Sequence, residues 1–404
     1  MNARIVSWFL VHFWLLINTA LAAPVIDGFS GTFTHGSIVT LSGSGFGSKS
    51  PVEPVSWDNF ESGSNAQAVH NVSPVIGPQW TSQRPNDLPR YSSDRAYSGN
   101  LSVKIDWIAE DYTIVAFGWT NQGPFDRLFI SWWRYHRASP EEVLNDVNCN
   151  VPVGDPSYNP DHCFNHKQLY VFGDAACTGS PSVYDCPQIL IGAIMTSRQN
   201  WLHAIQGGRD DQGNSIGSYT DQFRWDQNVH YRDTLNAWQR WDTYIQREEP
   251  YNTDNGLFKA WLGGRLVASE DTTDYNNIPF NWEDIRIGHM FRPHAPYSYF
   301  QSYFDDVYID STQARVELCN VASWSQKELT GAVCALQIPR NEWGASRLQA
   351  QVNAGSFSSG AQVWLYVIDR DGAVNSSGFP VTLGSSQQND SLAPAAPGNL
   401  RSQN

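Results

Sequence analysis

Three short stretches of the chain carry residue types suited to elimination chemistry on an acidic polysaccharide. They read RYHR at residues 134–137, HKQLY at 166–170 and GHMFRPHAPY at 288–297. Elimination beside a uronate carboxylate needs a base, a proton donor for the leaving oxygen, and a cation or amide that neutralises the acid group. The predicted catalytic residues are His136, Lys167, Arg134 and Tyr297, and the residues of these stretches predicted to contact substrate are Tyr170, His289 and Arg292.

The first stretch has the alternation of a β-strand. Successive strand residues point to opposite faces, so Arg134 and His136 share one face. We expect Lys167 to line the same concave surface and Tyr297 to lie near its rim. The simpler alternative is that these polar side chains bond to their neighbours or to solvent and take part in no reaction.

Tryptophan is abundant, with 17 residues in the chain. Aromatic rings stack on sugar faces, and we predict that Trp133, Trp201 and Trp225 bind substrate. Any one tryptophan of a β-sandwich can equally belong to the core. Trp201 and Trp225 lie in a long polar stretch, residues 201–235, that interrupts the strand pattern, and long loops in compact domains are often functional.

Hydrolysis of a glycosidic bond is disfavoured, because it needs two carboxyl groups placed across that bond. Glu248 and Glu249 are adjacent, and on a strand they would face opposite sides. Three functional hypotheses remain: non-catalytic binding of a polysaccharide, a polysaccharide lyase, and an adhesive or structural surface protein.

The stretch SYFDDVYID at residues 302–310 places Asp305 and Asp306 inside a strand-like run. Aspartate is depleted in strands, and one of the two carboxylates should face inward. A buried carboxylate needs a partner. A polar pair on an edge strand, bonded to nearby amides, is the simpler alternative.

The chain has 404 residues and a net charge of −14. This charge disfavours nucleic acid as a partner. Residues 1–22 read as a secretory signal, with Arg4, an apolar run and an A-x-A site at 20–22, although an uncleaved anchor is an alternative. No later segment is apolar enough to span a bilayer. We therefore expect a secreted protein, extracellular or periplasmic, whose oligomeric state the sequence does not indicate.

Six cysteines in the exported part predict disulfides. Fifteen pairings are open, and the economical one joins neighbours in the chain. Zinc is disfavoured, because no C-x-x-C pair is present. The predicted pairs are Cys149 with Cys163, Cys177 with Cys186, and Cys319 with Cys334.

The fold class predicted from the chain is all-β. Strand-like runs recur between residues 54 and 312 without a convincing long helix, which predicts a two-sheet sandwich or jelly roll. Shorter strand patterns occupy residues 23–53 and 313–384, and residues 385–404 read as a polar linker or tail.

The two outer strand regions resemble one known module. GSIVTLSGSGFG near the N-terminus is similar to the opening of an IPT/TIG domain, an Ig-like β-sandwich, and SWSQ with the strands to residue 384 resembles its later half. The resemblance implies one Ig-like domain split by the insertion of residues 54–312. Two small domains that flank a central one are the alternative.

The central region resembles the concanavalin A-like jelly rolls of carbohydrate-binding modules and of polysaccharide lyases, including the heparin-lyase-like group. The similarity rests on WDNFESG, AYSGNLSVKI, the hairpin at residues 238–267 and YFDDVYID. It implies a structural calcium ion held by Glu61 and Asp306, with Asn59 nearby. It also implies that the chain binds a polysaccharide, either without catalysis or as a lyase.

Overall fold

The computed structural model describes the backbone of most of the chain. The described residues are 22–82, 89–106, 113–120, 122–138, 164–174, 187–195, 200–201, 205–206, 236–251, 253–275, 279–292, 300–329 and 332–387. The predicted signal at 1–22 and the predicted tail at 385–404 therefore fall almost wholly outside the described part. Among the described residues the chain is all-β with one short helix, α2 (Trp324–Leu329), as predicted. None of the helical structure described could cross a membrane.

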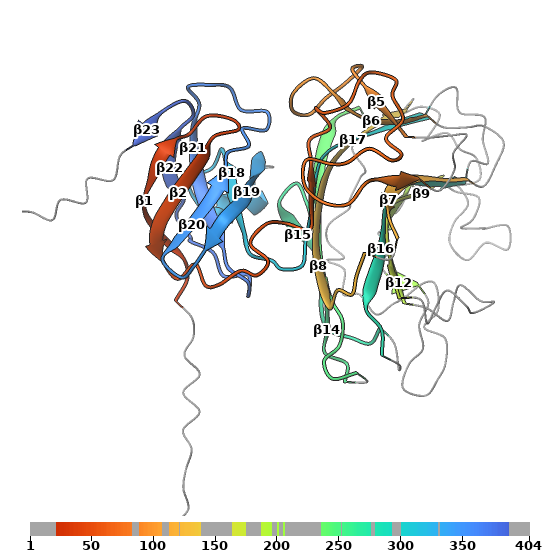
Figure 1. The fold of residues 1–404 in the computed structure, drawn as a ribbon. Helices are drawn as coiled ribbons and strands as arrows, with labels where there is room; N and C mark the ends of the chain where they lie inside the picture. Colours follow the sequence, from red (N-terminus) through yellow and green to blue (C-terminus); the bar gives the residue numbers. More distant parts are fainter. Residues whose placement is uncertain are drawn as a thin grey trace, which may run out of the picture.

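Strands from both ends of the described chain form one β-unit, which we call the flanking unit (Figure 1). Its strand order is β22-β21-β18-β19-β20-β2-β1-β23. β2 pairs with β20 from Ile38 opposite Gln351 to Ser42 opposite Arg347. The strands are β1 (Val25–Thr32), β2 (Ile38–Ser44), β18 (Arg315–Cys319), β19 (Cys334–Trp343), β20 (Arg347–Gln351), β21 (Gln362–Ile368), β22 (Phe379–Thr382) and β23 (Ser386–Gln387).

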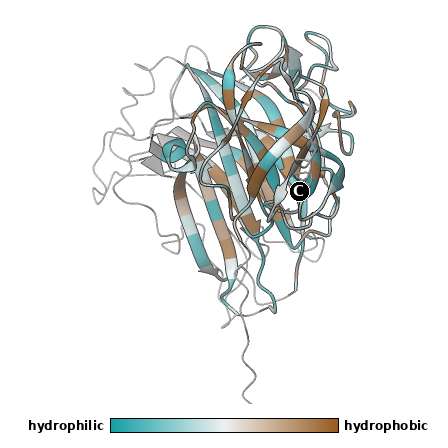
Figure 2. Ribbon diagram, turned by 90° about the vertical axis from the view of Figure 1, so that its left-hand side faces the viewer, coloured by the Kyte–Doolittle hydropathy of each residue, from teal (hydrophilic) through white to brown (hydrophobic). Residues whose placement is uncertain are grey.

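The flanking unit has a hydrophobic core of its own. Phe29 and Leu41 from the N-terminal strands pack with Val316, Leu348 and Leu365 from the later ones. Its strands alternate between hydrophobic and hydrophilic residues, as Figure 2 shows. Segments that are about 270 residues apart in the sequence thus bury their apolar faces against each other.

The residues between these two segments form a jelly-roll sandwich of two antiparallel sheets. The sheet next to the flanking unit, here the junction sheet, has the order β15-β14-β13-β8-β17-β6-β5, and β3 pairs with β17. Its strands are β3 (Ser56–Asp58), β5 (Arg90–Ser92), β6 (Ser102–Asp106), β8 (Arg127–Ala138), β13 (Trp238–Gln246), β14 (Gly256–Leu262), β15 (Arg265–Thr273) and β17 (Phe300–Asp310).

The second sheet, here the outer sheet, has the order β11-β10-β9-β16-β7-β4, and β12 pairs with β10. Its strands are β4 (Thr81–Ser82), β7 (Thr113–Trp119), β9 (Phe164–Gly173), β10 (Gln188–Met195), β11 (Asn200–Trp201), β12 (Ile205–Gln206) and β16 (Trp282–Arg292). The main core lies between the two sheets and includes Trp132 from β8, Leu169 from β9 and Ile287 from β16.

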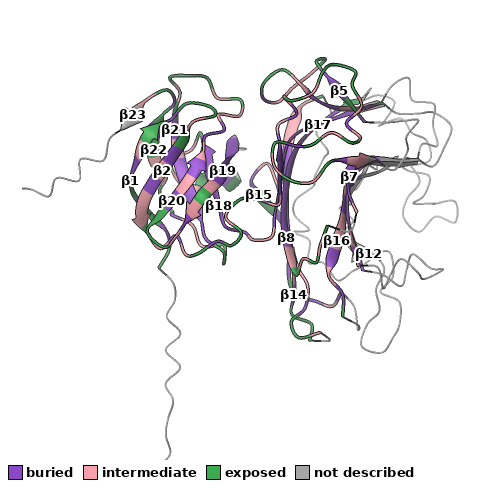
Figure 3. Cartoon of the chain, viewed as in Figure 1, coloured by how far each residue is buried: buried purple, intermediate pink, exposed green. Residues whose placement is uncertain are grey.

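The junction sheet is buried on both of its faces over much of its length (Figure 3). Leu128 and Ile130 of β8 face the sandwich core. Phe129, between them, packs on the opposite face with Tyr308 and with Ile338 of the flanking unit. The flanking unit is therefore packed against the jelly roll through an apolar cluster and is not merely tethered to it.

Ion pairs between buried groups cross the same junction. Arg240 of β13 contacts Asp242 at 2.8 Å and Glu317 of β18 at 3.2 Å. Glu317 also contacts Arg315 at 2.8 Å and Lys327 at 2.6 Å. Burial by itself would raise the pKa of Glu317, but the three cations, led by Arg240, hold it well below its usual range. Buried charges persist only when they are paired in this way.

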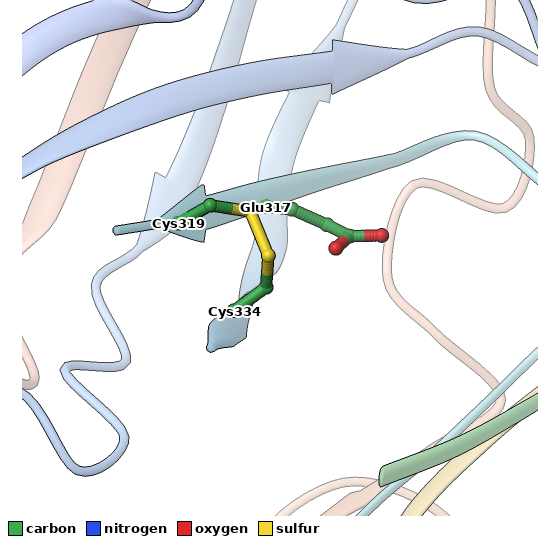
Figure 4. A group of neighbouring side chains, drawn as sticks. All are labelled: Glu317, Cys319 and Cys334. Carbon is green, nitrogen blue, oxygen red and sulfur yellow. A yellow bond between two sulfur atoms is a disulfide. The ribbon is translucent and has the colours of Figure 1, made fainter. Parts of the chain in front are cut away.

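Cys319 and Cys334 form a disulfide that joins β18 to β19, with Cα atoms 4.1 Å apart. Figure 4 shows this bond next to Glu317. The pairing confirms one of the three predicted bridges. Because both sulfur atoms are bonded to each other, their proximity to Glu317 does not make a metal site. The remaining four cysteines, Cys149, Cys163, Cys177 and Cys186, lie outside the described residues.

Candidate functional site

The residues predicted to form the site fall on two different sheets. Arg134, His136 and Trp133 belong to β8 of the junction sheet, whereas Lys167 and Tyr170 belong to β9 of the outer sheet. Arg134 and His136 therefore do not share a sheet face with Lys167. The predicted grouping failed because the sheet that a strand joins depends on pairing between distant segments.

Arg134 and His136 do share one face of β8, because its pairing with β13 runs without a shift from Arg127 to Tyr135. Each side chain is only 1% exposed. Arg134 Nη2 donates to Gln239 Oε1 at 2.8 Å, and His136 Nδ1 lies 2.9 Å from Ser302 Oγ. Burial holds the pKa of Arg134 well below its usual value. Both groups are therefore interior and bonded to neighbouring side chains.

Trp133 lies on the opposite face of β8 and is 8% exposed. Its ring stacks on Tyr97, with the ring centroids 3.6 Å apart and an interplanar angle of 14°. This face of Trp133 is thus covered by a residue of the chain itself and is not open to a ligand.

The outer sheet presents a different set of side chains on the face that points away from the core. In β9 Leu169 and Val171 belong to the main core, while Tyr170 and Phe172 form a separate cluster with Leu190 of β10. Tyr170 and Leu190 are buried in this cluster, and Phe172 is half-buried. The rings of Tyr170 and Phe172 are nearly parallel, with centroids 5.9 Å apart and an angle of 6°. Alternation along one strand has therefore aligned two aromatic rings in a row.

Charged side chains of β16 stand beside these rings. Arg286 pairs in register with Tyr170, and Asp284 pairs with Phe172. The guanidinium carbon of Arg286 lies 4.4 Å from the centroid of the Phe172 ring, a cation–π contact. Its Nη2 atom lies 3.3 Å from Asp284 Oδ2. We call Tyr170, Phe172, Leu190, Arg286 and Asp284 the aromatic face.

The pKa of Arg286 is lowered by burial, which outweighs the opposing effect of Asp284. The two side chains nonetheless keep 20% and 13% of their surface exposed. A partly buried guanidinium next to a carboxylate places hydrogen-bond donors beside hydrogen-bond acceptors. A hydroxyl-rich ligand needs both.

The backbone brings further predicted residues to the same sheet. Lys167 pairs with Met290, His289 with Val115, and Arg292 with Asn165. The ladders are irregular here: the β9–β16 register shifts between Ile287 and Met290, and the β9–β10 register shifts at Ile191. Bulges of this kind often lie next to active sites.

Several predicted site residues cannot be placed by their side chains. The side chains of Lys167, His289, Arg292 and Trp201 lie outside the described set, and Trp225 and Tyr297 lie outside it entirely. Their roles stay predictions.

Phe172, Asp284 and Arg286 were not predicted from the sequence. The signal was present in the alternation of β16, where Asp284 and Arg286 flank the core residue Ile285. Asp284 and Arg286 could have been predicted as outward-facing residues of a strand whose other face is apolar.

The aspartate pair is accommodated by a bulge. The β17–β8 register shifts between Asp305 and Tyr308, and Asp306 has a positive φ of 46°. Asp305 Oδ2 accepts hydrogen bonds from the Tyr97 and Ser98 amides at 2.7 and 3.1 Å. Asp306 Oδ1 accepts one from Ser98 Oγ at 2.9 Å. Both carboxylates thus find partners in one loop.

Glu61 bonds to the same loop as this pair, the loop of residues 97–101. Its Oε1 atom accepts hydrogen bonds from the amides of Asn100 and Leu101, both at 2.7 Å. Burial raises the pKa of Asp306 to about 6, and the negative charge of Glu61 contributes to the rise. Asn59 Oδ1 accepts a weak bond from the Glu61 amide at 3.4 Å.

Comparisons with known proteins give a fold likeness only. No family model matches the chain, and no curated protein matches it. Among solved structures, an alginate lyase Aly36B mutant in complex with alginate trisaccharide is similar over 64% of this chain and 98% of its own, with 8% identity and a TM-score of 0.44. The endo-beta-1,4-glucuronan lyase of Trichoderma reesei is similar over 66% and 96%, with 11% identity and a TM-score of 0.37.

A lectin, UEA-II complexed with galactose, is similar over 55% of this chain and 91% of its own, with 10% identity and a TM-score of 0.28. At these scores the likenesses carry no argument about activity. The structure itself shows an all-β protein in which a jelly-roll sandwich packs against a smaller β-unit.

Proposed function

We propose that this chain is a secreted, carbohydrate-active protein that binds a polysaccharide through the aromatic face of its outer sheet. The observation that carries the proposal is the half-buried ring of Phe172, which lies next to the buried ring of Tyr170 and has the partly exposed side chains of Arg286 and Asp284 at its side. Flat rings stack on pyranose faces, and planar charged groups bond the hydroxyl groups around them.

A polysaccharide lyase is the second candidate. The observation in its favour is that Tyr170 and Arg286 are direct neighbours across two strands, on the sheet whose backbone also carries Lys167. In the reaction a base removes the proton beside the uronate carboxylate, the electron pair forms the new C=C bond, and the C–O bond to the leaving sugar breaks as that oxygen takes up a proton. Tyr170 would supply that proton, and Arg286 would neutralise the carboxylate.

A structural calcium ion belongs to the same proposal. The donor chemistry fits, because the carboxylates of Glu61 and Asp306 both bond to the loop of residues 98–101, where Ser98 adds a hydroxyl group. Calcium accepts such oxygen ligands in irregular geometry. Glu61 and Asp306 would hold the ion, with Asn59 nearby, and the ion would tie the segment after β3 to β17.

A panel of neutral and uronate-containing polysaccharides tests binding and lysis together. Retention without a new ultraviolet absorbance from an unsaturated uronate supports binding alone. If such absorbance appears, Tyr170→Phe should remove it while retaining binding, because the ring stays and only the hydroxyl is lost. Neither retention nor lysis with any polysaccharide of the panel would refute both proposals.

A further inference from the structure

The flanking unit carries an open groove of about 370 Å³ that no part of the sugar-binding proposal uses. Residues 23–26, at the start of β1, line one side, and residues 374–380, which lead into β22, line the other. Ile26 and Phe379 connect the groove to the hydrophobic core of the flanking unit. Val25, also in the lining, is 50% exposed and is one of only a few large apolar side chains so exposed in the described part of the chain.

Two strand edges meet at this groove. β1 pairs with β2 through Val25–Ser30, but on its other side it pairs with β23 only at Gly31 and Thr32. β22 pairs with β21 on one side. Within the described residues, therefore, no strand occupies the other edge of β1 from Val25 to Ser30. Natural β-proteins usually cover such edges, because an open edge pairs with other chains.

β23 already points along the open edge. It is antiparallel to β1, with Ser386 opposite Thr32 and Gln387 opposite Gly31. The next residues of the chain, continued in that register, would pass Ser30 and run toward Val25. Six residues at about 3.3 Å each span about 20 Å, and the chain extends beyond this length.

The same register brings an apolar residue to the groove. The segment that follows Gln387 reads QNDSLAPA, and Leu392 is its only large apolar side chain. If the pairing continued, Leu392 would come opposite Val25 or Ile26, depending on whether the irregularity of β1 between Ile26 and Gly28 shifts the register. The polar residues before Leu392 would run along the part of β1 that does not line the groove.

We propose that residues 388–395 extend β23 along the open edge of β1 and seat Leu392 in this groove, so that the chain closes its own flanking unit. A tethered segment has a high effective concentration at the edge, because β23 is already docked there. This gives the segment an advantage over a strand donated by another molecule.

Hydrogen exchange on the full chain and on a chain that ends at Gln387 tests the proposal. Amides of Val25–Ser30 should exchange at least tenfold faster in the shortened chain, while amides of β8 exchange equally in both, which shows that the shortened chain is folded. Equal exchange of Val25–Ser30 in both chains would overturn the proposal.

Point variants of the full chain give a second test. Leu392→Asp should accelerate exchange at Val25–Ser30, whereas Leu400→Asp, a matched change beyond the reach of the groove, should not. Equal effects of the two variants would contradict the assigned register. Protection that disappears on dilution, together with a dimer in sedimentation, would assign the edge to a second copy and would also overturn the proposal.

Discussion

Arg240 of the jelly roll and Glu317 of the flanking unit form a buried ion pair at 3.2 Å across the junction. Both side chains are at most 4% exposed. Arg315, which also contacts Glu317, has its guanidinium carbon 4.3 Å from the ring centroid of Phe129, a member of the apolar cluster with Tyr308 and Ile338. Two units that are separate in the sequence pattern are thus held together by charges that neither could bury alone.

The first prediction concerns this pair. Glu317→Gln should lower the free energy of unfolding by roughly 3–5 kcal/mol, because it leaves Arg240, Arg315 and Lys327 without their common anion. Urea denaturation measures this change. Glu342→Gln serves as the control, because Glu342 forms a partly exposed contact with Arg347 at 3.5 Å, and its loss should cost less than about 1 kcal/mol. Equal effects of the two variants would show that the buried network does not stabilise the junction.

The second prediction concerns pH. Burial raises the pKa of Asp310 to about 6, even though Lys49 contacts it at 2.8 Å and opposes the rise. A carboxyl group whose pKa is higher in the folded state binds its proton more tightly there, so its contribution to stability falls as the pH rises from about 4 to about 6. Over that range the wild type should lose up to about 3 kcal/mol relative to Asp310→Asn. Denaturation curves of both proteins at several pH values measure the difference, and a constant difference would contradict the prediction.

The third prediction concerns calcium. If Glu61 and Asp306 hold an ion, a chelator should lower the melting temperature of the wild type and leave that of Asp306→Asn unchanged. Asp371→Asn, at an exposed position of the flanking unit, should respond to the chelator as the wild type does. A wild-type melting temperature that does not change with chelator or added calcium would show that Glu61 and Asp306 hold no stabilising calcium ion. Calorimetry with and without calcium supplies the measurement independently of any activity.

The sequence predicted the fold class well, because its signals are local. Alternation around Arg134 and in YFDDVYID identified strands that the structure contains as β8 and β17. Neighbour pairing predicted the disulfide of Cys319 and Cys334, whose strands are adjacent in the sheet. Local rules succeed where the partners are close in the chain or where one strand supplies the whole pattern.

The site was harder to predict, because it depends on long-range pairing. RYHR and HKQLY look alike as strands, yet β8 and β9 enter different sheets. The bulge at Asp306 is set by the loop around Ser98, more than 200 residues earlier. Arg286 was not predicted, because only the pairing of β16 with β9 places it beside Tyr170 and Phe172. The IPT/TIG resemblance of the flanking unit stays a prediction.

The most direct test of the central claim measures binding of a polysaccharide retained in the panel to the wild type and to Phe172→Ala. Loss of the ring should weaken binding at least tenfold, about 1.4 kcal/mol, because the stacking surface beside Arg286 is removed. Phe357→Ala, which removes a partly buried ring of the flanking unit, should bind as the wild type does. Equal affinity of the wild type and Phe172→Ala in titration calorimetry would contradict the claim that the aromatic face binds sugar.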